Sequence, residues 1–297
     1  MQRYRFKKID AFVMERSSGN PAGCIYLPSE DALSAEGMQQ IARELSGCVS
    51  EVVYVYPDEG HTGLKFFSSE REVAFCGHGT IAAMYDLIKN DPVLSRDPVT
   101  RIHAGGQELL VRNEIAKADA VFISAPQPVE QKLSISRDCI AAALRIAPAE
   151  ISEKHRIACI NAGLATLIVP LDSLDTLLSI HPDQLHLKEF CLSNGIEIIL
   201  VFSTVTSKAG NSYRTRVFAP IFGYLEDPAT GSGNAALGYY LLKEDTWDGR
   251  MIAIEQGKSR EHPNIIRLVS DASKVQRSVF FGGNAIVRIE GEYLLYP

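Results

Sequence analysis

The chain has 297 residues, of which 46% are hydrophobic and 22% charged, a balance typical of a globular protein with room for about two domains. The net charge is -6 and Lys and Arg are not clustered, which disfavours a nucleic-acid partner. The apolar runs are too short for a membrane span, and the amino terminus has no signal-like apolar region. The six cysteines and seven histidines are dispersed, so we expect a cytoplasmic protein with reduced thiols, no membrane contact and no metal.

The first elements of the chain alternate strands with a helix. Strands are predicted at residues 6–12 and 24–27, on either side of a turn rich in Ser, Gly, Asn and Pro. Residues 34–45 carry apolar side chains at helical spacing, and Ser34 is placed to cap that helix. Residues 51–56 then predict another strand.

The same order of fragments occurs again later in the chain. The recurring pairs are residues 20–27 and 161–170, residues 34–56 and 184–202, residues 65–68 and 216–219, and residues 76–83 and 230–237. This repetition predicts an α+β fold of two pseudo-symmetric domains, each a curled, mostly antiparallel sheet around a central helix. We expect an N-terminal domain over residues 1–126, rejoined by a last strand over 285–297, and a C-terminal domain over 127–284.

Two glycine-rich motifs, residues 76–80 and 230–234, each lead into an apolar helix, expected over 81–88 and 235–242. A helix start offers unsatisfied N–H donors and the positive end of the helix dipole, and glycine lets an anion approach the backbone. We therefore expect the motifs to bind a small carboxylate-bearing substrate. The candidate substrate-binding residues are Gly77, Gly79, Thr80, Gly231, Ser232 and Gly233.

Two other interpretations of the glycines remain. Both motifs fit the G-x-G-x-x-A pattern of dinucleotide-binding proteins, but the residues before them do not form the buried parallel strand which that fingerprint requires. Alternatively, the glycines only permit tight helix packing. The recurrence of the motif favours an anion site over mere packing.

Ionisable residues lie at or near both motifs. Glu51 opens a strand on the same face as apolar residues, where desolvation would make its carboxylate a better base, although a solvated strand end is the alternative. The helix start should leave His78 a neutral imidazole. Asp227 and Ser232 bracket the second motif, where simple turn roles are also open. Cys76 is either a reactive thiol or a buried filler, and its separation of two residues from His78 predicts that these side chains do not meet productively.

Together these residues resemble the PhzF family of phenazine biosynthesis-like proteins, which shares its fold with diaminopimelate epimerase. The resemblance rests on residues 10–12, 19–23, 41–51, 75–80, 223–233, 256–257 and 282–285. It implies a cofactor-independent isomerase, a substrate cleft between two similar domains, and a homodimer. It also implies that Glu51 is the catalytic glutamate that moves a proton between substrate carbons, and that His78, Asp227 and Ser232 occupy substrate-binding and proton-relay positions.

Other activities stay open beside this one. A two-thiol racemase or epimerase needs a cysteine in both motifs, but Thr230 stands where the second would be, and its hydroxyl is too weak an acid for that role. A thiol hydrolase using Cys76 and His78, and a non-catalytic metabolite-binding or partner-binding protein, are further alternatives. Departures from the family pattern at Ser68-Ser69, Ala74 and residues 260–263 leave the substrate undefined.

Overall fold

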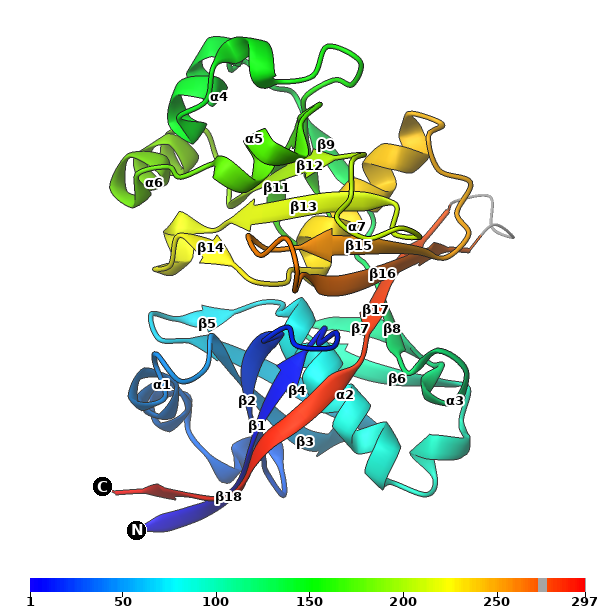
Figure 1. Cartoon of the computed structure of the whole chain (residues 1–297). Coiled ribbons are helices and arrows are strands. Elements are labelled where there is room, and N and C mark those ends of the chain that lie inside the picture. Colours follow the sequence, from blue (N-terminus) through cyan, green and yellow to red (C-terminus); the bar gives the residue numbers. More distant parts are fainter. Residues whose placement is uncertain (272–276, 297) are drawn as a thin grey trace. The chain divides into compact units, whose positions relative to one another are not determined.

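The computed structural model describes residues 1–271 and 277–296, and the chain divides into two compact units (Figure 1). The first unit contains Met1–Ser124 and Gly282–Pro297, and the second contains Ala125–Phe281. Each unit combines a mixed, mostly antiparallel sheet with helices, so the α+β fold class is confirmed. The sequence predicts the domain boundaries after residues 126 and 284, which is two and three residues later than the boundaries in the structure.

The first unit forms one sheet with the strand order β18-β1-β2-β3-β4-β6-β7-β8, and β5 pairs with the far end of β4. The β2–β3 and β4–β6 pairs are parallel. The α-helices and strands are β1 (Gln2–Ala11), β2 (Asn20–Tyr26), α1 (Ala35–Glu44), β3 (Glu51–Asp58), β4 (His61–Ser68), β5 (Glu72–Val73), α2 (Gly77–Asn90), β6 (Val99–Ala104), β7 (Gln107–Asn113), α3 (Ile115–Ala118), β8 (Val121–Ser124) and β18 (Ala285–Leu295).

The second unit repeats this pairing scheme. Its sheet runs β9-β10-β11-β12-β13-β15-β16, with β14 on the far end of β13 and parallel pairs at β11–β12 and β13–β15. Its elements are β9 (Val129–Gln131), α4 (Arg137–Leu144), β10 (Ala158–Asn161), β11 (Ala165–Pro170), α5 (Leu174–Ser179), α6 (Gln184–Ser193), β12 (Ile198–Ser203), β13 (Tyr213–Phe218), β14 (Glu226–Asp227), α7 (Gly231–Lys243), β15 (Ile252–Gln256) and β16 (Asn264–Ser270); β17 (Val279–Gly283) leads back to the first unit.

A helix that is buried on nearly every side lies at the centre of each unit. In α2 the whole stretch from Gly77 to Asp86 is buried, and the helix packs against β1, β2 and β3, and also against β8 at the other end of the sheet. In the second unit α7 packs against β10, β11 and β12 and against β16. Because an apolar helix must be covered all round, the sheet curls about it. The two predicted central helices are therefore present, each beginning at its glycine motif.

The outer faces of the sheets are covered by further helices. In the first unit α1 packs on β3 and β4, and the Ser34 side chain caps it by accepting a hydrogen bond from the Gly37 N–H at 3.2 Å. In the second unit α4, α5 and α6 cover a cluster that includes Leu167, Val169 and Ile199. The helices expected over 34–45 and 184–192 are confirmed as α1 and α6.

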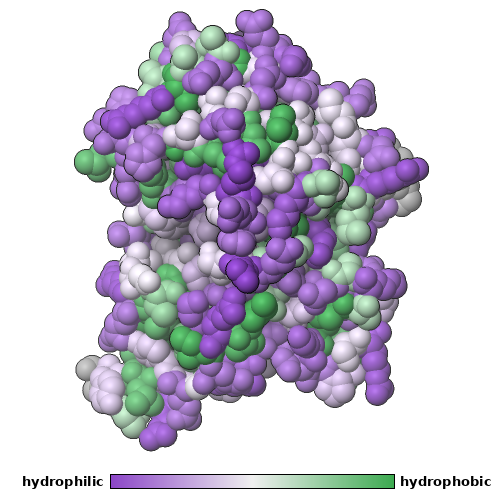
Figure 2. Space-filling model, viewed as in Figure 1, coloured by the Kyte–Doolittle hydropathy of each residue, from purple (hydrophilic) through white to green (hydrophobic). Residues whose placement is uncertain are grey.

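The surface of the described residues is mainly polar on the face drawn in Figure 2, with apolar residues scattered among hydrophilic ones. Within residues 1–271 and 277–296, none of the helices has the length and apolar character required to cross a membrane.

A buried ion pair fastens α2 to the strands of the first unit. Lys7 Nζ on β1 lies 2.8 and 2.9 Å from the two carboxylate oxygens of Asp86 on α2, and the two side chains are only 3% and 5% exposed. The Tyr26 hydroxyl on β2 donates to the same carboxylate at 2.6 Å, and the Asn90 amide donates to it at 3.0 Å. Three elements therefore share one buried carboxylate, and each contact satisfies a polar group that has left water.

We predict that Asp86→Asn lowers the free energy of unfolding by about 3 kcal/mol, because the buried Lys7 ammonium then keeps, among the described residues, only the half-exposed Glu290 carboxylate, 3.6 Å away, as a counter-charge. Urea unfolding followed by circular dichroism measures the change. The matched control is Glu292→Gln, which breaks the exposed Arg3–Glu292 pair and should cost less than about 1 kcal/mol. Equal losses in the two variants would contradict this account of Asp86.

Candidate active site

Glu51 and His78 come together inside the first unit. Glu51 is the first residue of β3, paired with Ala22 of β2 on one side and Ser68 of β4 on the other. His78 is the second residue of α2, and its Nε2 lies 3.2 Å from Glu51 Oε2. Both side chains are 6% exposed, so Glu51 is not a solvated strand end.

Burial determines the protonation of His78. It lowers the pKa of His78 to about 3, while a hydrogen bond to the Pro21 carbonyl acts in the opposite direction. The imidazole is therefore neutral near pH 7, as expected, but the main cause is desolvation rather than the helix start. The 3.2 Å between His78 Nε2 and Glu51 Oε2 is within the range over which a proton is transferred, so the two side chains are close enough to exchange one when they are aligned.

Cys76 also belongs to this cluster. It is the N-cap of α2, where its Sγ accepts a hydrogen bond from the Gly79 N–H at 3.4 Å. Its Sγ lies 3.5 Å from His78 Nδ1, so these two side chains are in contact although only two residues separate them in the sequence. The reason is that Cys76 precedes the helix in extended backbone conformation, which turns its side chain back over the first turn.

The same three side chains have a donor set that suits a divalent metal ion. One ligand atom from each of Glu51, Cys76 and His78 lies within 4.8 Å of the other two. Carboxylate, thiolate and imidazole are all zinc ligands. The geometry of this cluster therefore fits both a proton-transfer site and a metal site.

The remaining residues of the first motif shape the helix start. A Cβ atom on Gly79 would lie 2.6 Å from Val53 Cγ2, so only glycine fits against β3 at this position. Thr80 donates its hydroxyl to the Cys76 carbonyl at 2.7 Å and its N–H to the same carbonyl at 3.0 Å. Gly77, Gly79 and Thr80 are buried, and both donors of Thr80 are used within the first turn of α2.

The second motif is held by a side chain to which the sequence assigned no role. Gln256, at the end of β15, accepts hydrogen bonds from the Thr230 N–H at 3.0 Å and the Asn234 side chain at 2.7 Å. Its amide nitrogen donates to the Asp227 carbonyl at 2.8 Å and the Thr230 hydroxyl at 3.0 Å. Gln256 therefore forms hydrogen bonds with the polar groups at the start of α7, and it belongs to the same unit as that helix. The glycines made the motif recognisable in the sequence, whereas Gln256 appeared there only as part of the family resemblance, without a role.

Asp227 and Thr230 are also in contact. The Thr230 hydroxyl donates to Asp227 Oδ2, and both residues are buried, with 5% and 6% exposure. Gly231, Ser232 and Gly233 form the buried first turn of α7, and a Cβ on Gly231 would lie 2.4 Å from the Phe281 ring. The structure thus groups Glu51, Cys76 and His78 in one unit, and Asp227, Thr230 and Gln256 in the other.

The pairing registers show which residues of the two units correspond. Two series of paired residues anchor the comparison, Val52–Phe67–Glu72 in the first unit and Ile199–Phe218–Glu226 in the second. Glu51 precedes Val52 as Ile198 precedes Ile199, so these two residues correspond. In the same way Asp227 follows Glu226 as Val73 follows Glu72. Cys76 and Thr230 correspond as N-caps with nearly the same backbone angles, φ -130° and -119° with ψ 106° in both. Each unit therefore carries one carboxylate that its counterpart lacks.

The strands that precede the two glycine motifs exclude a dinucleotide-binding fold. They are β5 and β14, two residues each and antiparallel to their neighbours. A dinucleotide fold needs a longer buried parallel strand there.

A comparison with protein families matches residues 9–291 to the model described as phenazine biosynthesis-like protein (PhzC-PhzF). The chain belongs to this family. A curated relative from Clostridium acetobutylicum, named an uncharacterized isomerase, is 29% identical over 99% of each chain. The trans-2,3-dihydro-3-hydroxyanthranilate isomerase of Pseudomonas aeruginosa is 27% identical over 98% of this chain and 100% of its own.

Solved structures support the fold of the family. A PhzF family protein from Bacillus anthracis has a TM-score of 0.85 at 22% identity, covering 99% of this chain and 100% of its own. A hydroxyproline epimerase from Agrobacterium vitis has a TM-score of 0.66 at 11% identity, covering 99% of this chain and 91% of its own. The likeness extends to epimerase folds, as the sequence resemblance implied.

We predict that the burial of neutral His78 makes stability fall in acid. Below the ordinary histidine pKa of about 6.5 the unfolded state binds a proton that folded His78 does not, so the free energy of unfolding rises with pH by up to about 1.4 kcal/mol per unit between about pH 4 and pH 6.5. In His78→Gln this part of the slope is lost. Urea unfolding at several pH values in this interval measures it, and parallel curves for the two proteins would refute the assignment.

Proposed function

We propose that this isomerase of the PhzC-PhzF family moves a proton between two carbons of a small carboxylate-bearing substrate, with Glu51 as the acid and base. The observation that carries the proposal is the contact of a 6% exposed Glu51 carboxyl with His78 at the start of α2. A carboxyl group withdrawn from water is a stronger base than a solvated one, and a neutral imidazole beside it can hold or return a proton.

The proposed reaction needs no electron acceptor. The Glu51 carboxylate removes a proton from a carbon beside a double bond, and the electron pair moves along the conjugated system. Glu51 then returns the proton to a second carbon, so the product is an isomer and Glu51 recovers its charge. His78 orients the carboxyl group, and Asp227 and Ser232 serve as substrate-binding or relay groups from the second motif.

The proposed substrate class follows from the motifs and from one relative. Helix starts bind carboxylates through backbone N–H groups, and two glycine-rich helix starts are present. The Pseudomonas relative is named for trans-2,3-dihydro-3-hydroxyanthranilate, a small ring compound with a carboxylate. We propose a substrate of this kind, and we retain the cytoplasmic location, the homodimer and the lack of nucleic-acid binding as predictions.

A thiol-dependent reaction is the second candidate, because Cys76 Sγ lies 3.5 Å from His78 Nδ1. A neutral imidazole at that distance can accept the thiol proton. A two-thiol racemase would need a second cysteine at the corresponding N-cap, and that residue is Thr230, whose hydroxyl donates to Asp227. This favours Glu51 over paired thiols as the source of the base.

We predict that Glu51→Gln lowers kcat by about 10²–10⁴, because the amide cannot accept the proton from carbon. The assay uses trans-2,3-dihydro-3-hydroxyanthranilate and a panel of small amino and hydroxy acids in heavy water, with deuterium incorporation followed by NMR. Wild-type protein should exchange a carbon-bound hydrogen and the variant should not.

The matched control is Cys76→Ser in the same cluster, which should keep kcat within about tenfold of wild type if Glu51 is the base. If Cys76→Ser is inactive and Glu51→Gln is active, the result favours the thiol reaction. Binding of the carboxylate compounds by wild-type protein without any exchange would favour a non-catalytic binding protein.

We predict that the isomerase activity survives treatment with EDTA and dialysis, because the proposed proton transfer uses no metal. The same deuterium assay gives the rate before and after treatment. A loss of activity restored by Zn²⁺ would instead assign the cluster of Glu51, Cys76 and His78 to a metal ion.

A further inference from the structure

A second cluster of ionisable side chains lies on the first unit and contains none of the proposed active-site residues. It consists of two histidines, His61 and His103, and two carboxylates, Asp58 and Glu108. His61 begins β4, His103 lies on β6, and Glu108 lies on β7. His61 is two residues from Gly63, which pairs with His103, and His103 pairs in turn with Glu108. Since side chains two apart share a face of a strand and paired residues lie side by side, the three side chains project from one face of the sheet.

We propose that His61, His103 and Glu108 bind a divalent transition-metal ion. A ligand atom from each lies within 4.8 Å of the others, and His103 Nε2 is 4.0 Å from Glu108 Oε2. Ligand distances of about 2.0–2.2 Å let one ion contact two atoms separated by up to about 4.2 Å. The side chains of His103 and Glu108 are 34% and 43% exposed, so small rotations bring the donors onto one ion.

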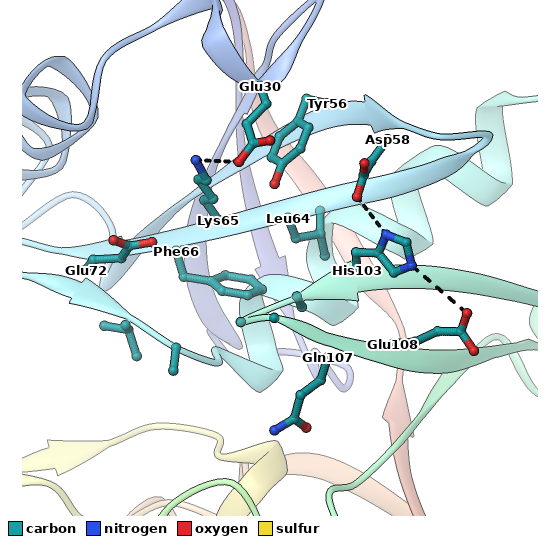
Figure 3. Close-up of a pocket in the computed structure, with 15 residues that line it drawn as sticks. Glu30, Tyr56, Asp58, Leu64, Lys65, Phe66, Glu72, His103, Gln107 and Glu108 are labelled. Atoms are coloured by element: carbon teal, nitrogen blue, oxygen red, sulfur yellow. Dashed lines mark hydrogen bonds and ion pairs between the residues drawn. The ribbon is translucent and has the colours of Figure 1, made fainter.

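Asp58 gives His103 the orientation that a metal ligand requires. Its Oδ2 lies 2.6 Å from His103 Nδ1, where a carboxylate can only accept, and Nε2 faces Glu108 (Figure 3). In the neutral ring this arrangement leaves the lone pair of Nε2 available on the side of Glu108. A carboxylate that holds the far nitrogen of a histidine is the usual support for a metal-binding imidazole. Asp58 is thus a positioning residue rather than a ligand.

The hairpin between β6 and β7 fixes the site before any ion arrives. Its turn residues Gly105 and Gly106 have φ values of 56° and 72°, as a two-residue hairpin turn requires. A Cβ on Gly105 would lie 2.0 Å from the Ala74 carbonyl oxygen, so the turn is seated against the segment after β5. The register that places His103 beside Glu108 is therefore held at the turn.

The donor set selects the kind of ion. Two imidazoles and one carboxylate suit Zn²⁺, Co²⁺, Ni²⁺ or Cu²⁺ better than Mg²⁺ or Ca²⁺, which prefer oxygen. Three protein donors leave coordination positions for water, and an open pocket of about 770 Å³ borders Asp58, His103 and Glu108. The competing interpretation is a purely structural cluster in which the Arg101–Glu108 and His103–Asp58 pairs only join strands.

Titration of the full-length protein with Co²⁺, followed by calorimetry and visible absorbance, tests the proposal. We expect one equivalent to bind with micromolar affinity and without a thiolate charge-transfer band, because this site contains no sulfur, in contrast to the cluster around Cys76. His103→Ala and His61→Ala should each weaken binding tenfold or more. Asp58→Asn should weaken it by about 10–100-fold while both metal-binding imidazoles remain.

The matched control is His181→Ala, which removes an exposed histidine of the second unit and should leave the titration unchanged. Circular dichroism shows whether each variant is folded, and His61 is exposed enough for its replacement to be tolerated. Binding that is unaffected in both His61→Ala and His103→Ala would overturn the proposal. So would binding only at millimolar Co²⁺, or a dominant thiolate band that disappears in Cys76→Ser.

Discussion

The constraint on which the structure depends is that each unit encloses a helix with almost no exposed side. Such a helix cannot begin in water, so its first N–H groups lie inside the protein. Small residues are needed there because the strands come close, as the Gly79–Val53 and Gly231–Phe281 approaches show. The glycine motifs are therefore required by packing, and the same packing creates a buried, electropositive helix start.

The two units have met this constraint with different polar groups. In the first, Cys76 accepts the N–H of Gly79, and in the second Gln256 accepts the N–H of Thr230. Comparison of the strand registers shows that Glu51 occupies the position equivalent to Ile198, and that Asp227 occupies the position equivalent to Val73. The repeat conserves the architecture of the helix start but not the ionisable residues around it. Since a single carboxylate at each site replaces an apolar side chain, the proposed chemistry is expected to be asymmetric.

The fold could be predicted because its signals are local. Ser34 before a helical pattern, and glycines before an apolar helix, mark element boundaries that neighbouring residues determine. The contact of Glu51 with His78 could be anticipated only through a family resemblance, because 27 residues separate them in the sequence. The contact between Cys76 and His78 was not expected from their spacing, since residue spacing does not convey the extended backbone of an N-cap. The hydrogen bonds of Gln256 could not be read from its place in the resemblance, and the row of His61, His103 and Glu108 depends on strand register, which no sequence motif reveals.

The histidines show how burial divides one residue type between two kinds of chemistry. His78 is enclosed beside a carboxyl group, and desolvation lowers its pKa and keeps the ring neutral, which suits the proposed role of holding or returning a proton beside Glu51. His103 is one-third exposed and held by Asp58 on one nitrogen, which leaves the other directed toward a solvent-accessible carboxylate. Water can reach the second arrangement, so a hydrated cation can enter it and exchange ligands there. The imidazole itself is the same in both places, and it is the surrounding sheet that leads us to propose proton transfer for one and metal binding for the other.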